Sequence, residues 1–296
     1  CKVMELGQHN YIGIYPLTAL PNTPFGDPEY IKKYNLKIIE TYPAFSHVDV
    51  SNQNEFEREK MVVGNNEMDV EGYKDAQIYR WMFMFAHYLG YMQYISRFIS
   101  NYKNISFKNF YMDFMNFCEN STESVFLKKE IVETDKSLSI FLSTKGPMGR
   151  VLDKVRKNFA WDYEEATAIN IVQSKDLFYD EVKSFLKNYS INEEIVDDLI
   201  KYQKDTIIDP NIKYPLQKTY KYNFYEMINY SAKLEKKSHK YLIEGKNYEG
   251  DIFEWGKETL WWGRRVAACK AKIKNINNSK IIKDLSDFNP VIFDKR

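Results

Sequence analysis

Residues 81–96 read WMFMFAHYLGYMQYIS, a run of sixteen residues without Asp, Glu, Lys or Arg. A membrane-spanning helix needs about 20 consecutive apolar residues. This run is shorter, and it contains His87 and Gln93. We therefore interpret it as a central core helix from Ile78 to Phe98, apolar on most of its surface. Such a helix must be covered by other elements, which predicts a mainly helical protein without a membrane partner.

The composition excludes several classes of protein. The 296 residues include 42 Lys and Arg against 41 Asp and Glu, and 16% of them are aromatic. Disordered chains lack aromatics and carry a large net charge, whereas disulfide scaffolds need many cysteines in a short chain. A nucleic-acid partner is not expected, because there is no basic excess. The length suits one large domain or two ordinary domains of roughly 100–200 residues each.

Glycine and cysteine patterns argue against several cofactor sites. The 12 glycines form neither a GxGxxG nor a GxxxxGK[ST] pattern, so a self-contained nucleotide enzyme is disfavoured. Cys1, Cys118 and Cys269 are far apart, without the spacing of an iron–sulfur or zinc site. We expect Cys118 and Cys269 to be buried thiols. The four histidines form no metal motif, and no metal site is predicted.

The rest of the chain alternates helical and strand patterns. We predict an α+β fold that is mainly α, with a small antiparallel β-sheet, in which strands at 36–41 and 56–64 pair. Strands at 218–225 and 239–244 are predicted to pair as well. The predicted helices lie at 107–118, 151–159, 163–172, 175–187, 192–206 and 252–274.

Two adjacent acid pairs, Glu164-Glu165 and Asp197-Asp198, resemble catalytic dyads only in sequence. Neighbouring residues of a helix do not face the same way, so neither pair forms a dyad. A solvated helix face is the preferred interpretation for both.

Residues 255–265 read WGKETLWWGRR and concentrate tryptophan and arginine. Glu258 and Trp262 share a helix face at a spacing of four residues. We prefer a structural interpretation, in which the tryptophans pack and Glu258 pairs with Arg265 or a neighbour. The alternative is functional: Arg264 or Arg265 holds a carboxylate or phosphate of a substrate through two hydrogen bonds.

Residues 15–25 read YPLTALPNTPF, after a predicted strand at 11–15. Asp27 before Pro28 predicts a helix start. This segment resembles radical S-adenosylmethionine (SAM) enzymes that have an upstream cobalamin-binding domain. Those enzymes end their barrel with a strand and a P-G-T-P-like turn, and Asn22 stands where they more commonly have Gly. The resemblance continues from residue 55 through the 81–98 helix, which is similar to their C-terminal extension.

The chain also departs from that family. It contains neither the CxxxCxxC motif that holds the [4Fe–4S] cluster nor the D-x-H-x-x-G pattern of the cobalamin domain. The resemblance therefore implies a fragment: the C-terminal part of a longer, cytoplasmic enzyme, with methyl transfer as its candidate reaction. SAM, the cluster and, as a further candidate, cobalamin would be bound by the missing N-terminal domains, and no cofactor by this chain.

The resemblance also implies a division of the chain. Residues 1–34 would be the remnant of the barrel's end, 35–275 a mainly helical accessory domain that shapes the pocket for a small-molecule substrate, and 276–296 a loosely packed tail. The candidate substrate-binding residues are His9, Tyr15, Asn22, His87, Glu258, Trp262, Arg264 and Arg265. The first three would lie nearest the mouth of the active site.

Two other functions remain open. The chain is alternatively a non-catalytic module that uses its aromatic residues to bind a sugar or a partner protein. It is otherwise an unrelated helical enzyme whose acidic residues converge in a cleft only in three dimensions.

Overall fold

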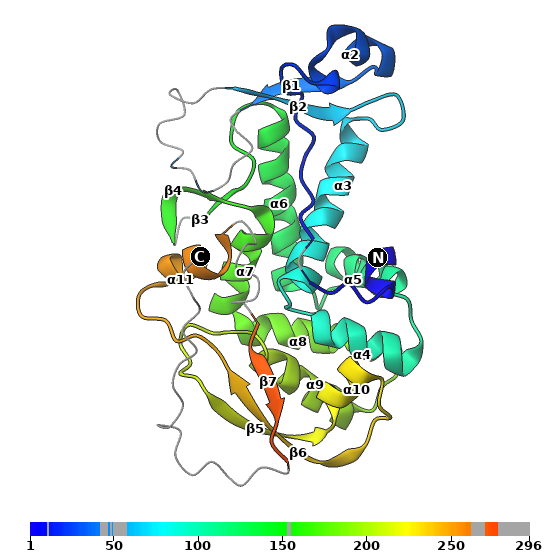
Figure 1. The fold of residues 1–296 in the computed structure, drawn as a ribbon, viewed down its shortest axis with the longest axis vertical. Coiled ribbons are helices and arrows are strands. Elements are labelled where there is room, and N and C mark those ends of the chain that lie inside the picture. The colour runs from blue at the N-terminus through cyan, green and yellow to red at the C-terminus, as the bar shows by residue number, and fades with distance from the viewer. Residues whose placement is uncertain are drawn as a thin grey trace.

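The protein is mainly helical with small antiparallel sheets, as predicted (Figure 1). A computed structural model describes residues 1–10, 12–41, 47, 49, 58–152, 155–261 and 270–277. The α-helices within these ranges are α1 (Lys2–Glu5), α2 (Pro28–Tyr34), α3 (Val70–Phe83), α4 (Gln93–Lys103), α5 (Phe107–Asn120), α6 (Val125–Leu142), α7 (Tyr163–Gln173), α8 (Lys175–Leu186), α9 (Glu193–Asp205), α10 (Phe224–Tyr230) and α11 (Ile252–Thr259). The short turns of other helix types are η1 (Pro24–Gly26), η3 (Met84–Tyr88) and η4 (Lys187–Tyr189).

The described strands form three separate antiparallel sheets. They are β1 (Lys37–Thr41) with β2 (Glu59–Gly64), β3 (Arg150–Leu152) with β4 (Arg156–Trp161), and β5 (Leu216–Tyr222), β6 (Lys236–Glu244) and β7 (Lys272–Asn275) in that order. The predicted pairing of the first two strands is confirmed, with Ile39 opposite Met61. The predicted pairing of β5 with β6 is confirmed too, with Lys218 opposite Tyr241.

The predicted central helix is wrong as a single element. The chain forms α3, changes to a π-helical turn at η3, breaks, and resumes as α4. Gly90 lies in the break with φ of +98°, in the left-handed region that favours glycine. A Cβ at Gly90 would lie 2.7 Å from Cδ of Lys270, so a distant side chain occupies the space that the break opens.

Two other predicted helices are also wrong. The segment 151–159 belongs to the β3–β4 hairpin, where Phe159 and Trp161 bury their rings. Aromatic residues favour such a pleated, half-buried surface, and their strand preference prevails here. The helix predicted at 252–274 ends at Thr259 as α11, and Lys272 begins β7. Residues 262–269 lie outside the described residues.

The first twenty residues, Tyr11 excepted, include α1 and form an N-terminal segment that is attached to the other helices. Residues 12–17 form neither helix nor strand, so the strand predicted at 11–15 is not found in its described part. The segment runs alongside α3 toward the β1–β2 hairpin (Figure 1). It pairs with β2 only at its end, where Leu17 O accepts from Val62 N and Ala19 N donates to Lys60 O. The division of the chain at residue 34 stays a prediction.

Three buried or capping contacts hold this N-terminal segment along its length. Glu5 accepts a hydrogen bond from the first amide of α5, at Phe107 N (2.7 Å). Gln93 Nε2 donates to the carbonyl of His9 (2.6 Å), and Arg80 Nε donates to the carbonyl of Ile14 (2.8 Å). The course of the segment is therefore set by side chains of α3 and α4 and by the first amide of α5.

The aromatic surplus builds the core. The largest fully buried side chains include Trp81, Trp161, Trp255, Tyr91 and Tyr111. Burying one such side chain contributes about 1.5–3 kcal/mol or more. No helix among the described residues is long and apolar enough to cross a membrane.

Candidate functional site

Two of the predicted candidates, His9 and His87, meet in the structure although 78 residues separate them. Nδ1 of His9 lies 3.1 Å from Nε2 of His87, and both rings contact Phe107. His87 belongs to η3 and is fully buried, whereas His9 lies in the N-terminal segment and is half-buried. The pair thus lies where the extended segment crosses the helical core.

Buried hydroxyl groups continue the hydrogen bonding behind His87. Its Nδ1 lies 2.8 Å from the hydroxyl of Tyr111 and 3.3 Å from Oγ of Ser96. Tyr111 Oη and Ser96 Oγ are themselves 3.2 Å apart. The π-helical turn and the start of α4 bring these groups together, and such turns occur frequently at functional sites.

Gln93 holds the backbone of both histidines, and Lys270 in turn contacts Gln93. Gln93 Nε2 donates to the carbonyls of both His9 and His87, at 2.6 and 3.0 Å. The ammonium of Lys270 donates to Gln93 Oε1 at 3.3 Å, and its methylene stem passes over Gly90. Because Gly90 has no side chain, there is room for the stem of Lys270, which is remote in sequence.

The cluster keeps both imidazoles neutral. Burial, followed by the charges of Arg97 and Lys270, lowers the pKa of His9 to about 4. Burial also lowers the pKa of His87 well below its usual value, with His9, Lys270 and Arg97 acting in the same direction. A neutral imidazole donates through one nitrogen and accepts through the other. The contact of His87 with Tyr111 therefore determines which nitrogen of His87 carries its proton, and this in turn determines which nitrogen of His9 does.

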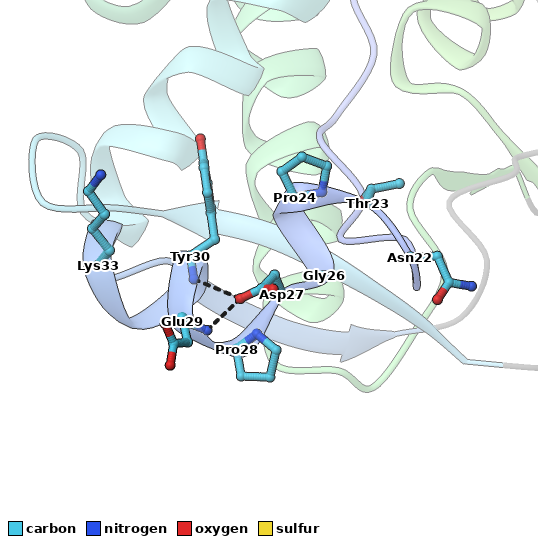
Figure 2. A pocket seen from close by; sticks show the side chains of 9 residues that line it. All are labelled: Asn22, Thr23, Pro24, Gly26, Asp27, Pro28, Glu29, Tyr30 and Lys33. Atoms are coloured by element: carbon cyan, nitrogen blue, oxygen red, sulfur yellow. Dashed lines mark hydrogen bonds between the residues drawn. The ribbon is translucent and has the colours of Figure 1, made fainter.

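The other N-terminal candidates lie apart from this cluster. Tyr15 is 81% exposed, and Asn22 lines an open hollow of about 820 Å³ beside α2. Figure 2 shows Asn22 at one end of this hollow and Lys33 at the other. Asp27 accepts from Glu29 N and Tyr30 N there, which confirms the predicted helix cap.

Of the C-terminal candidates, only Glu258 lies within the described residues. Glu258 pairs with Lys246 at the surface. Trp262, Arg264 and Arg265 lie outside the described residues, so the pairing of Glu258 with Arg265 stays a prediction.

A buried histidine–carboxylate pair was missed by the sequence analysis. Nε2 of His47 makes a short contact with Oε2 of Glu165, although the two residues are 118 positions apart in the sequence. The His47 ring packs on Trp261 with centroids 4.6 Å apart, and burial lowers its pKa to about 3. Asp162 and Glu165 form the capping box of α7, and their spacing was the one local sequence pattern that could have pointed to Glu165.

The solvated face predicted for Glu164-Glu165 is wrong, because both residues are buried. Glu164 pairs with Arg80 through two contacts of 3.2 and 3.4 Å, while Glu165 meets His47. The two acids face different partners and do not form a dyad, as predicted. Burial raises the pKa of Glu164 to about 7 against the opposing effect of Arg80.

A second buried network lies beside Glu164 and serves the packing of α6 against α7. Arg150 pairs with Glu130 at 2.6 Å, and Thr167 donates to the same carboxylate at 2.7 Å. Trp81 Nε1 donates to Thr167 at 2.9 Å. These groups are mutually satisfied, which is typical of a structural role.

The described residues do not fit an iron–sulfur cluster. Cys118 is buried, as predicted, and burial raises the pKa of its thiol, which disfavours the thiolate that binds metal. Cys269 lies outside the described residues. Within the described ranges, no three His, Cys, Asp or Glu side chains are grouped so that they could hold a metal ion.

No family model matches this chain. It is 22% identical over 236 residues to the cobalamin-dependent radical SAM methyltransferase TokK of Streptomyces tokunonensis, which covers 75% of this chain and 34% of that protein. It is also 22% identical over 225 residues to the 2-(S-pantetheinyl)-carbapenam-3-carboxylate methyltransferase of Streptantibioticus cattleyicolor, which covers 71% and 33%. The matches thus span about a third of the length of these relatives. The chain is distantly similar to radical SAM methyltransferases over about 70% of its length.

Proposed function

We propose that this chain is the accessory region of a cobalamin-dependent radical SAM methyltransferase, where it shapes the pocket for a small-molecule substrate. The supporting observation is the similarity to two such methyltransferases over about a third of their length. The chain itself has no CxxxCxxC spacing. The cluster, SAM and cobalamin would then be bound by other domains of the same polypeptide.

The exposed side of the N-terminal segment supports this proposal. Although its backbone is tied to the helices, the segment turns large apolar side chains to solvent: Val3, Leu6, Ile14, Tyr15, Leu17 and Leu20. Exposed apolar side chains are available to contact another protein part. We propose that these six side chains contact the cofactor-binding domains.

His9 would be the residue that joins this contact to the pocket. It belongs to the N-terminal segment, but its ring is anchored on His87 in the helical core. A group held in this way has a fixed orientation, which a substrate-contacting side chain requires.

The coding sequence upstream of Cys1 is the first test, and we expect it to encode a CxxxCxxC motif. The second test compares the full-length protein with the 296-residue chain after anaerobic supply of iron, sulfide and cobalamin. We expect reductive cleavage of SAM by the full-length protein only. Cleavage by the 296-residue chain alone, or an upstream sequence without the motif, would contradict the proposal.

A further inference from the structure

The hydroxyl groups behind His87 locate the proton of its ring. Ser96 Oγ donates its single proton to the carbonyl of Gln93 at 3.0 Å. Tyr111 Oη donates its own proton to Ser96 Oγ at 3.2 Å. Neither hydroxyl then has a proton left for Nδ1 of His87, which lies 2.8 Å from Tyr111 Oη. Nδ1 therefore carries the ring proton and donates it to Tyr111.

The reverse arrangement makes fewer hydrogen bonds. If Tyr111 donated to Nδ1 of His87, nothing would donate to Oγ of Ser96, and three hydrogen bonds would become two. The side chains of Ser96, Tyr111 and His87 are all fully buried, where a hydrogen bond that is not made costs the most. The proton is therefore more stable on Nδ1 of His87.

This proton leaves the outward nitrogen of His9 with a lone pair. Burial lowers the pKa of both rings, so both are neutral at pH 7 and each has one protonated nitrogen. Nε2 of His87 accepts, and its donor is Nδ1 of His9 at 3.1 Å. Nε2 of His9 therefore has no proton. Within the described part of the chain it has no hydrogen-bond partner, and it is not a buried atom, so solvent reaches it.

An open lone pair on a fixed ring favours a neutral hydrogen-bond donor. An ionised carboxylate has only acceptors and does not fit. An ammonium group would have to lose water beside Phe107, whose ring packs on that of His9 with centroids 5.5 Å apart. Burying a charge there costs far more than burying a neutral polar group. An O–H or N–H group on an apolar body suits both the nitrogen and the neighbouring ring.

We propose that Nε2 of His9 accepts a hydrogen bond from a neutral O–H or N–H group of a ligand. His87, Tyr111 and Ser96 are the positioning residues that keep this nitrogen unprotonated. Because a methyl ether or a tertiary amide lacks the proton, the site would bind it less well. That the ligand is the substrate of a methyltransferase rests on the proposed function; the tautomer of His9 and its preference for a donor do not.

The first test uses the imidazole nitrogen resonances of the 296-residue chain at pH 7, with His9→Asn to identify those of His9. We expect His9 and His87 both to carry the proton on Nδ1. Phenol and anisole are then titrated separately, since they share a ring and only phenol has a proton to donate. Phenol should shift the His9 Nε2 resonance saturably. It should bind about three- to tenfold more tightly than anisole, as one neutral hydrogen bond allows.

Hydroxyl variants test the positioning residues. In Ser96→Ala the buried hydroxyl of Tyr111 loses its acceptor and should donate to Nδ1 of His87. This inverts both tautomers and abolishes the preference for phenol. Ser124→Ala is the matched control, because Ser124 is another buried serine that donates to a helix carbonyl, that of Cys118. It should keep the wild-type tautomers. Tyr111→Phe should keep them too, because Ser96 Oγ lies 3.3 Å from Nδ1 and still accepts.

A wild-type spectrum with the His9 proton on Nε2 overturns the proposal, as does equal binding of phenol and anisole. It is equally overturned if Ser96→Ala keeps the wild-type tautomers, or if Ser124→Ala or Tyr111→Phe inverts them. Tyr111→Phe decides the role of the positioning residues if Ser96→Ala does not fold. An upstream sequence without CxxxCxxC would leave these results intact, so the two proposals fail separately.

Discussion

His9 makes the folded chain sensitive to acid. Its pKa is about 4 in the folded protein and about 6.5 when unfolded, so the unfolded chain binds the additional proton first. The stabilisation is therefore complete above pH 6.5 and is lost as the pH falls toward 4. His87, whose pKa is also lowered, contributes in the same direction.

We expect the His9→Asn variant to lose stability less steeply than the wild type between pH 6.5 and 4. One group contributes at most about 1.4 kcal/mol per pH unit, and less when it is half-exposed as His9 is. Urea unfolding at matched pH values measures the difference, and titrating groups that do not interact with His9 cancel in the comparison. Parallel stability curves for the two proteins would refute this account.

At the level of elements, the break between η3 and α4 depends on Gly90. An alanine there would be strained at φ +98° and would also collide with the Lys270 stem. Gly7→Ala is a matched control, because Gly7 has φ of +84° and nothing within 4 Å of the added Cβ. We expect Gly90→Ala to cost about 1–3 kcal/mol more in unfolding free energy than Gly7→Ala. Equal losses in chemical denaturation would mean that crowding by Lys270 has no effect.

Local signals sufficed for the elements that depend on neighbouring residues. Asp27 caps the helix predicted to begin after it, and Asn192 caps the helix predicted at 192–206. Such caps act within three residues, so the sequence displays them directly. The alternation at 218–225 and its pairing with 239–244 were visible for the same reason.

The errors occurred where distant residues decide. The break at Gly90 accommodates Lys270, and the β3–β4 hairpin passes so close that a Cβ at Gly149 would lie 2.3 Å from the carbonyl of Trp161. The site could be predicted only in part. His9 and His87 were candidates, but their contact joins residues that are 78 positions apart in the sequence. The His47–Glu165 pair depended on a similar long-range contact, which a single sequence does not show.

At the scale of the whole molecule, Arg80 ties three parts together. Its guanidinium pairs with Glu164 of α7, and its Nε holds the carbonyl of Ile14 in the N-terminal segment. Arg80→Met would leave a buried carboxylate without its cation and should cost about 3–5 kcal/mol. Lys60→Met, which removes only an exposed pair with Glu40, should cost less than about 1 kcal/mol.

Unfolding in urea tests the stability, and limited proteolysis tests the attachment of the segment. We expect cleavage near Ile14 to accelerate in Arg80→Met and to remain slow in Lys60→Met. The double variant Arg80→Met/Glu164→Leu should recover part of the stability, because no buried charge remains unpaired. Its proteolysis should stay fast, since the Ile14 carbonyl still lacks its donor. An Arg80→Met protein as stable as Lys60→Met would count against this role.

The brace from Lys270 to Gln93 spans 177 residues, and this span bears on the order in which the chain folds. Closing so large a loop has an entropic cost that must be met before the contact stabilises anything. Contacts of high sequence separation slow folding. During synthesis, the His9 and His87 rings must therefore wait for nearly the whole chain to emerge before their surroundings are complete. The surroundings of His9 and His87 would therefore be among the last features of this region to form.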